Sequence, residues 1–240
     1  MAQDLDLAQP SAEDTLGRLA ADRDLLGRAG TAQRVAEVLR DRIAEGALPP
    51  GTRLSEHALG AALGVSRNTL REAFRTLVDG RLVVHEMNRG VFVRTLGPDD
   101  VVDIYAVRSA LEGTGLRAAT GAAPERIAAL EAAVAGGEAA ARAGDWAEVG
   151  TADLRFHRAL AALAGSARID EFMNRLLAEL RLAFLAMPSA RGLHEPFLRR
   201  NREIADLLTA GDTDGAAAVL ERYLDDARRM ICDSMRADGA

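Results

Sequence analysis

Two short helices joined by a tight turn constrain this chain more than any other feature of its sequence. In ALGAALGVSRNTLREAFRTLVDG, residues 58–80, Gly64 ends one helical pattern and Ser66 caps the next almost at once. Ser55 is suited to cap the first of these helices. Two helices with so short a glycine-containing connection are typical of a helix-turn-helix, and a further helical pattern that begins at Thr31 precedes them.

The second helix of this pair has two different sides. A stripe with the spacing of a core-facing helix consists of Leu70, Ala73, Phe74 and Leu77. An adjoining side carries Arg67, Asn68, Arg71 and Arg75. These side chains are suited to phosphates and base edges if the helix enters a major groove. The alternative is an ordinary solvated arginine face.

After Gly80 the sequence period changes to two. The runs 82–85 and 91–94 flank a turn at residues 88–90, which predicts a β-hairpin, or wing. Arg89 and Gly90 at its tip would lie over the minor groove beside the predicted helix. The tight turn, this hairpin and the local charge favour a nucleic-acid interface over a solvated face.

The bulk composition supports a mainly α fold in two domains. The 240 residues are 48% hydrophobic and only 4% aromatic, which favours helices packed on helices. Net charge is −6, yet residues 31–96 carry 10 arginines against 7 acidic residues. We expect a flexible acidic tail over 1–30, a winged helix-turn-helix over 31–96 and an all-α bundle over 97–235. The six helical patterns of the bundle cover 98–120, 124–143, 145–164, 166–186, 193–210 and 212–235.

Other features point to the cytoplasm. The single Cys232 excludes an intrachain disulfide and is interpreted as a small buried hydrophobe. The sequence contains no apolar run long enough for a membrane span, and its acidic start lacks the parts of a signal peptide. We therefore expect a cytoplasmic protein with no membrane partner.

Polar residues interrupt the apolar stripes of four bundle helices. They are Arg108, Asp153, His157, Asn201 and Tyr223. Buried polar groups without partners cost roughly 2–7 kcal/mol each, so these must satisfy one another, a metal or a ligand. Each also has a simpler interpretation, such as an i, i+4 pair of Arg108 with Glu112 or a histidine satisfied within the core.

Residues 31–96, which follow the tail, resemble the winged helix-turn-helix of the GntR family of bacterial transcription regulators. The resemblance rests on the PG-x-RL-SE turn, LGVSR, the LREA helix and the RG-x-x-V wing, which occur in that order. It implies DNA contacts at Arg53, Ser66, Arg67, Asn68, Thr69, Arg71, Arg89 and Gly90. Many members have Thr-Pro-Val after the first arginine of the helix, so Asn68 is a departure that bears on which bases are read.

The bundle is similar to the FCD effector domain of the FadR subfamily, through R-x-x-x-E, D-x-x-F-H and I-x-x-L-x-x-GD. The resemblance implies a divalent metal, often zinc, held by Asp153, His157 and two later histidines. Asn201 and Tyr223 stand at those two later positions, and neither is a usual zinc ligand. His194, two turns before Asn201, is an alternative ligand. Arg108 is the expected partner of a carboxylate effector.

Together these observations predict a homodimeric, ligand-responsive regulator, most often a repressor in this family. Two winged domains would bind a pseudo-palindromic double-stranded operator, and a small metabolite in the bundle would change that affinity. One alternative is a metal sensor without an organic effector. The other is a metal-dependent hydrolase using Asp153 and His157, for which the sequence offers no convincing third ligand and no nucleophile motif. We therefore expect no enzyme activity.

Overall fold

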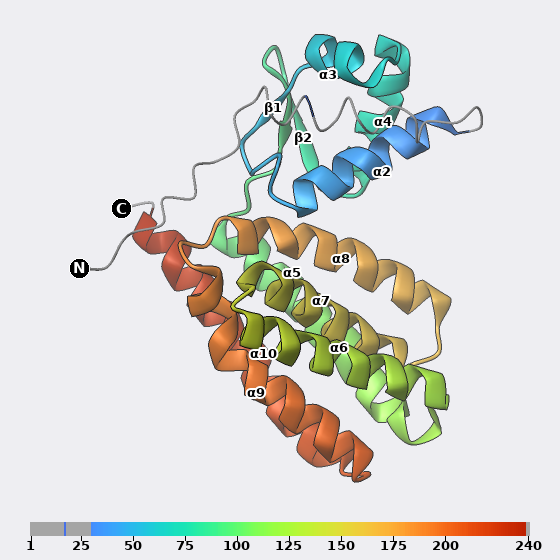
Figure 1. Cartoon of the computed structure of the whole chain (residues 1–240), viewed down its shortest axis with the longest axis vertical. Helices are drawn as coiled ribbons and strands as arrows, with labels where there is room; N and C mark the ends of the chain where they lie inside the picture. Colours follow the sequence, from blue (N-terminus) through green and yellow to red (C-terminus); the bar gives the residue numbers. More distant parts are fainter. Residues whose placement is uncertain (1–16, 18–29, 239–240) are drawn as a thin grey trace. The chain divides into compact units, whose positions relative to one another are not determined.

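The computed structural model describes Gly17 and residues 30–238, and it divides the chain after Thr95 into two compact units (Figure 1). The flexible tail expected over 1–30 falls almost entirely outside the described residues. The division lies beside the boundary expected between 96 and 97. Each unit is described by itself.

The first unit is built on three helices and a small sheet. Its elements are α2 (Thr31–Ala44), β1 (Arg53–Leu54), α3 (Glu56–Leu63), α4 (Arg67–Asp79), β2 (Val83–Glu86) and β3 (Gly90–Val93). Helices α2 and α3 both pack against α4, which also contacts β2. The predicted order of helix, helix-turn-helix and hairpin is therefore confirmed.

The turn between α3 and α4 forms for the reasons that its sequence suggests. The Ser55 side chain accepts a hydrogen bond from the backbone N–H of Ala58, and Ser66 accepts one from Thr69. Gly64, with φ of 66°, ends α3 in the left-handed region, where a residue without Cβ is favoured. These caps stop one helix and start the next within three residues, 64–66.

The wing is a three-stranded antiparallel sheet in the order β1-β3-β2 rather than a simple hairpin. Strand β1 was not predicted, because two residues cannot show an alternating pattern; it forms by pairing with β3, with Arg53 opposite Phe92. The two predicted strands are each displaced by one residue, to Val83–Glu86 and Gly90–Val93. Asn88, with φ of 62°, lies in the turn between them, and Gly90, with φ of 112°, begins β3.

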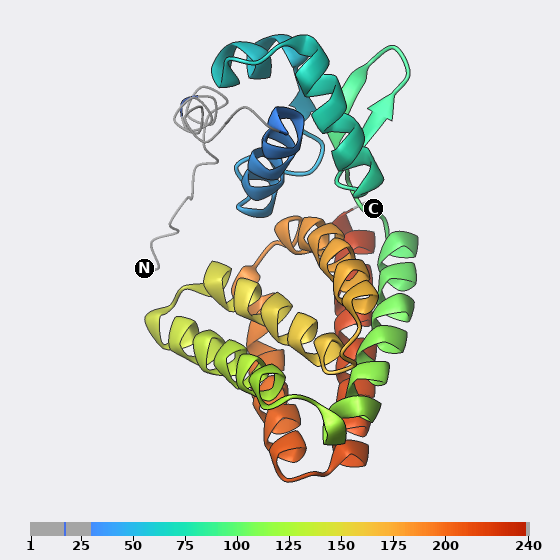
Figure 2. The same cartoon turned by 90° about the vertical axis from the view of Figure 1, so that its right-hand side faces the viewer.

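The second unit is the predicted bundle of six α-helices, and Figure 2 shows α5 and α10 running side by side within it. The helices are α5 (Pro98–Ala118), α6 (Pro124–Ala143), α7 (Trp146–Ala162), α8 (Ala167–Leu185), α9 (Ala190–Thr209) and α10 (Thr213–Asp238), with a short 3₁₀ turn η2 (Ala119–Gly121). Helix α9 begins at Ala190 instead of 193, because Ser189 caps it through the N–H of Gly192. Within the described part of the chain, no helix has both the length and the apolar character needed to cross a membrane.

Helix α7 lies at the centre of the bundle. It packs against α5, α6, α8 and α9, while α10 covers α5 and α9. The backbones of α5 and α7 meet at Gly115, where a Cβ atom would lie 1.9 Å from the carbonyl oxygen of Leu160. This close approach requires glycine, and it brings the polar side chains of α5 and α7 within reach of each other.

Candidate functional site

Helix α4 presents the two sides that its sequence predicts. Its buried residues are Leu70, Ala73, Phe74 and Leu77, which confirms the core-facing stripe. Its exposed residues include Arg67, Asn68, Arg71 and Arg75. The apolar side fixes the helix to the unit and leaves its arginines on the surface.

The two arginines at the start of α4 differ in how they are held. Arg71 donates a hydrogen bond from Nε to Glu56 Oε1 at 2.9 Å, yet its side chain remains 63% exposed. Arg67 makes no hydrogen bond or ion pair within residues 30–238. Neither side chain is withdrawn from the surface, so both are accessible to a polyanion.

The first turn of α4 contains side-chain hydrogen bonds that the sequence did not predict. Ser66 Oγ and Thr69 Oγ1 lie 2.9 Å apart in a hydrogen bond, and Asn68 Nδ2 donates to Glu72 Oε1 at 3.3 Å. These side chains are thus positioned before any ligand arrives. Their predicted contacts with DNA stay predictions.

The wing brings together two residues that are far apart in the sequence. A Cβ atom on Gly90 would lie 3.5 Å from Nε of Arg53, so the Arg53 guanidinium lies against the wing turn. Arg89 forms an ion pair with Glu86, and its guanidinium carbon lies 5.4 Å from the centre of the Phe92 ring. The predicted DNA contacts Arg53, Arg89 and Gly90 therefore lie close together in the wing.

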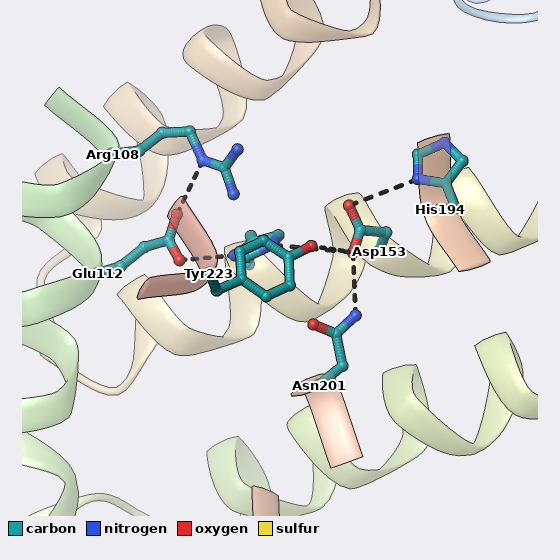
Figure 3. A network of polar contacts seen from close by, with 7 residues as sticks. Arg108, Glu112, Asp153, His194, Asn201 and Tyr223 are labelled. Carbon is teal, nitrogen blue, oxygen red and sulfur yellow. Dashed lines mark hydrogen bonds and ion pairs between the residues drawn. The ribbon is translucent and has the colours of Figure 1, made fainter. Parts of the chain in front are cut away.

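The second candidate site is a polar cluster inside the bundle (Figure 3). All five predicted residues are at most 7% exposed: Arg108, Asp153, His157, Asn201 and Tyr223. They come from α5, α7, α9 and α10 and are linked by the contacts described below. Figure 3 shows Arg108 and Glu112 on one side of the Tyr223 ring, with Asp153 and His194 on the other.

Glu112 joins the first half of the cluster. It accepts a hydrogen bond from Nε of Arg108 at 3.0 Å, and its other oxygen lies 2.6 Å from Nδ1 of His157. The Arg108 guanidinium carbon lies 4.6 Å from the centre of the Tyr105 ring. Burial lowers the pKa of Arg108, but the combined attraction to Glu112, Tyr105, Tyr223 and Asp153 outweighs burial and raises the pKa, so Arg108 stays charged.

Asp153 joins the second half. Its Oδ1 accepts hydrogen bonds from the Tyr223 hydroxyl at 2.7 Å and from Nδ2 of Asn201 at 2.9 Å. Burial would raise the pKa of Asp153, but His157, His194 and these two hydrogen bonds lower it. Burial raises the pKa of Tyr223 well above its usual value, so its hydroxyl keeps its proton.

Three further residues of the cluster were not predicted as site residues, although each carried a signal: Glu112, Tyr105 and His194. Glu112 and Tyr105 lie four residues after and three before Arg108, which places all three on one face of a helix. His194 was considered only as a substitute metal ligand; its Nδ1 lies 4.0 Å from Oδ2 of Asp153. Burial lowers the pKa of His194, which favours the neutral ring.

Three buried atoms of the cluster have no hydrogen-bond partner within the described residues: Arg108 Nη2, His157 Nε2 and Asn201 Oδ1. Next to Asn201, a cavity of about 10 Å³ is lined partly by Asp153, His194 and Asn201, but not by Arg108 or His157. That is room for about one water molecule. A metabolite could enter this site only if the surrounding helices moved apart.

The residues present do not fit a zinc ion. No group of three or more His, Cys, Asp or Glu residues is placed to hold a metal in the part of the chain that the structure describes. Tyr223 and Asn201, which stand where two further ligands would be needed, direct hydrogens toward the Asp153 carboxylate. A structural or catalytic zinc requires at least three protein donors of the right kind.

A winged helix-turn-helix and a separate helical bundle with a polar interior define a transcription regulator with two functional domains. Comparison with known families agrees. Residues 31–93 match the gntR family of bacterial regulatory proteins, and residues 103–226 match the FCD domain. The chain belongs to the gntR family and carries an FCD domain.

The relatives of this chain are regulators. It is 31% identical to the "Probable D-xylose utilization operon transcriptional repressor" of Paenarthrobacter nicotinovorans, over 83% of this chain and 88% of that one. A crystal structure of a GntR transcriptional regulator from Rhodococcus sp. RHA1 is 44% identical, has a TM-score of 0.80 and covers 85% of this chain and 98% of that chain. The gluconate operon transcriptional repressor of Bacillus licheniformis is 40% identical but matches only 36% of this chain and 35% of its own length.

These relatives decide between the function classes that the sequence left open. Both the family and the full-length relatives are transcription regulators and not enzymes, as expected. The hydrolase alternative is therefore excluded. The gluconate regulator shares too little of the chain to bear on what the bundle binds.

Proposed function

We propose that this chain is a ligand-responsive repressor of the FadR subfamily, whose bundle binds a small carboxylate metabolite and thereby changes operator affinity. The observation that carries the proposal is the state of Arg108, which is 1% exposed, charged, and has one terminal nitrogen without a partner. A buried donor left unpaired costs about 1–3 kcal/mol. A ligand carboxylate would remove that cost through a charge-assisted hydrogen bond.

The rest of the cluster supports a ligand that also carries hydrogen-bonding groups. Nε2 of His157 and Oδ1 of Asn201 are buried and unpaired, like Nη2 of Arg108. A ligand carboxylate at Arg108 and a ligand hydroxyl near Asn201 would supply partners for the unpaired atoms at both ends of the cluster. The ligand would therefore be polar along its length rather than a fatty chain.

The size of the cavity supports a coupling between ligand binding and helix movement. Because the cavity holds about one water molecule, the ligand requires a more open bundle. It would bind that open arrangement more tightly than the closed one, which is the condition for any allosteric response. The helices most directly affected would be α7, α9 and α10, which carry Asp153, Asn201 and Tyr223.

The DNA-binding half of the proposal assigns α4 to the major groove and the wing to the adjacent minor groove. The bases would be read by Arg67, Asn68 and Arg71, with Arg53 and Arg89 along the backbone or minor groove. A homodimer would match a pseudo-palindromic operator through its two-fold axis. Such a regulator would act in the cytoplasm, where the bacterial chromosome lies.

A thermal-denaturation screen in EDTA tests the carboxylate proposal. Mono-, di- and hydroxycarboxylates should include compounds that raise the melting temperature, while their uncharged amide counterparts should not. Arg108→Gln should lose that response, and Arg175→Gln, at an exposed position of the same unit, should keep it. If only uncharged compounds stabilise the protein, the carboxylate proposal is wrong.

Binding to the DNA upstream of the protein's own gene tests the regulatory half. A fluorescence-anisotropy titration should give tight, sequence-dependent binding whose affinity changes when a stabilising acid is added. A metal sensor would instead respond to zinc alone, with no acid present. No feature of the described residues favours that second reading.

A further inference from the structure

We propose that the polar site of this bundle works without a divalent metal. The Tyr223 hydroxyl and the Asn201 amide hold the Asp153 carboxylate by hydrogen bonds, in the role that a metal ion would otherwise have. The inference rests on the proposed function, since it concerns the same ligand site. It goes further because it names the groups that hold Asp153 in position and infers that ligand binding at the site requires no metal. Its evidence is the direction of the hydrogen bonds around Asp153.

Both groups that stand where metal ligands would be needed are hydrogen-bond donors. Tyr223 and Asn201 both direct hydrogens at the same oxygen, Oδ1 of Asp153, over 2.7 and 2.9 Å. A cation at that oxygen would face these hydrogens and would be repelled by them. The carboxylate is thus satisfied by neutral donors from α9 and α10.

The two imidazole rings near Asp153 do not converge on one point. His157 uses Nδ1 for Glu112 at 2.6 Å, and its Nε2 lies 3.8 Å from Oδ1 of Asp153. His194 approaches the other oxygen of Asp153, Oδ2, at 4.0 Å. Zinc needs three or four ligand atoms around one point, and these two rings approach different oxygens.

The Tyr223 ring is held by packing against two other aromatic rings. Its centre lies 4.8 Å from that of His157 in an edge-on contact and 4.7 Å from that of Phe197. Such aromatic contacts restrict the ring, so the hydroxyl stays aimed at Asp153. The hydrogen-bonded arrangement is therefore built into the packing of α7, α9 and α10.

The test measures metal content and melting temperature of the full-length protein and of one double variant. Wild-type protein dialysed with zinc and then desalted should carry far less than one zinc per chain, and EDTA should leave its melting temperature unchanged. Asn201→His with Tyr223→His supplies two imidazoles beside Asp153 and His157. That variant should take up about one zinc per chain and melt at a higher temperature with zinc than with EDTA.

Controls separate a real site from loose binding. Asp153→Asn added to the double variant should abolish its zinc uptake. One tightly held zinc in the wild type, lost in Asp153→Asn, would overturn the proposal. A folded double variant that takes up no zinc would overturn the role of Asn201 and Tyr223; if that variant does not fold, the wild-type zinc content decides.

The result is distinguishable from failure of the proposed function. If acids stabilise the wild type only when zinc is present, this inference fails and the carboxylate proposal stands. If no acid stabilises it under any condition while the wild type still takes up no zinc, the carboxylate proposal fails and the metal-free site stands. If acids act in EDTA, both are supported.

Discussion

Two arginine–glutamate pairs in this protein have almost the same geometry and opposite surroundings. In the DNA-binding unit, Nε of Arg71 lies 2.9 Å from Oε1 of Glu56; in the bundle, Nε of Arg108 lies 3.0 Å from Oε1 of Glu112. The first pair is 63% and 32% exposed, and the second is 1% and 0% exposed. An exposed pair is easily exchanged for a ligand, whereas a buried pair has no water to replace a lost partner.

The same contrast holds for the two units as a whole. Within the described residues, every buried polar or charged side chain lies in the bundle: Arg108, Glu112, Asp153, His157, Glu179, His194 and Asn201. The buried side chains of the DNA-binding unit are all apolar. One unit therefore keeps its polar chemistry on the surface, where a large polyanion can reach it, and the other encloses its polar groups in the interior of the bundle.

The largest expected effect comes from removing one buried charge. Glu112→Gln leaves the Arg108 cation without its counter-charge and disturbs the contact with His157, which should reduce the free energy of unfolding by about 3–5 kcal/mol. Glu56→Gln removes the matching charge at the exposed pair and should leave the urea midpoint nearly unchanged. Urea unfolding of both variants measures the contrast. Equal losses in the two variants would mean that the difference in burial has no energetic consequence.

At the exposed pair, DNA binding and not stability is the property that should change. Arg71→Ala should weaken specific operator binding roughly ten- to a hundredfold, because a paired arginine contact with guanine discriminates strongly between bases. The same change should leave the melting temperature of the protein nearly unchanged, since the side chain is exposed. Anisotropy titrations with operator and scrambled DNA provide the measurement. Undiminished operator affinity would remove Arg71 from the interface.

The third prediction concerns one hydrogen bond of the buried cluster. Tyr223→Phe keeps the ring but removes the donor to Asp153, and should cost about 1.5 kcal/mol at pH 7, because Asn201 still donates to the same carboxylate. The pKa of Asp153 is lowered in the folded protein, so its contribution is complete above its ordinary value of 3.8 and is lost as the pH falls through the lower folded value. The difference in the free energy of unfolding between variant and wild type should therefore become smaller as the pH is lowered. Urea unfolding at a series of pH values measures it.

The contrast also explains how much the sequence could predict. The positions of the helices followed from apolar period and caps, since Ser55, Gly64 and Ser66 act through their nearest neighbours. Strand β1 could not be predicted in this way, because its two residues are extended only through pairing with a strand nearly 40 residues later. Local signals sufficed wherever local contacts decide the structure.

In the cluster, the sequence identified which side chains point inward but not how they pair. The role of Glu112 depends on His157, 45 residues away, and the direction of the Tyr223 and Asn201 hydrogen bonds depends on three helices packing together. A helical wheel gives the face of each residue and says nothing of its partner across the bundle. The small size of the cavity was equally invisible, because it depends on how closely the helices approach.

The smallest expected effect concerns the helix caps of the DNA-binding unit. A cap can stabilise its helix, and it can also position a side chain for DNA. Ser66→Ala and Ser55→Ala each remove the hydroxyl that accepts one backbone hydrogen bond at the start of a helix, and each should cost about 1 kcal/mol of stability. Only Ser66 also orients Thr69, at 2.9 Å, on the helix proposed to enter the groove. Operator affinity should therefore fall further for Ser66→Ala than for Ser55→Ala, although thermal unfolding shifts alike. Equal losses of affinity would assign both caps to folding alone and leave the recognition surface to the arginines.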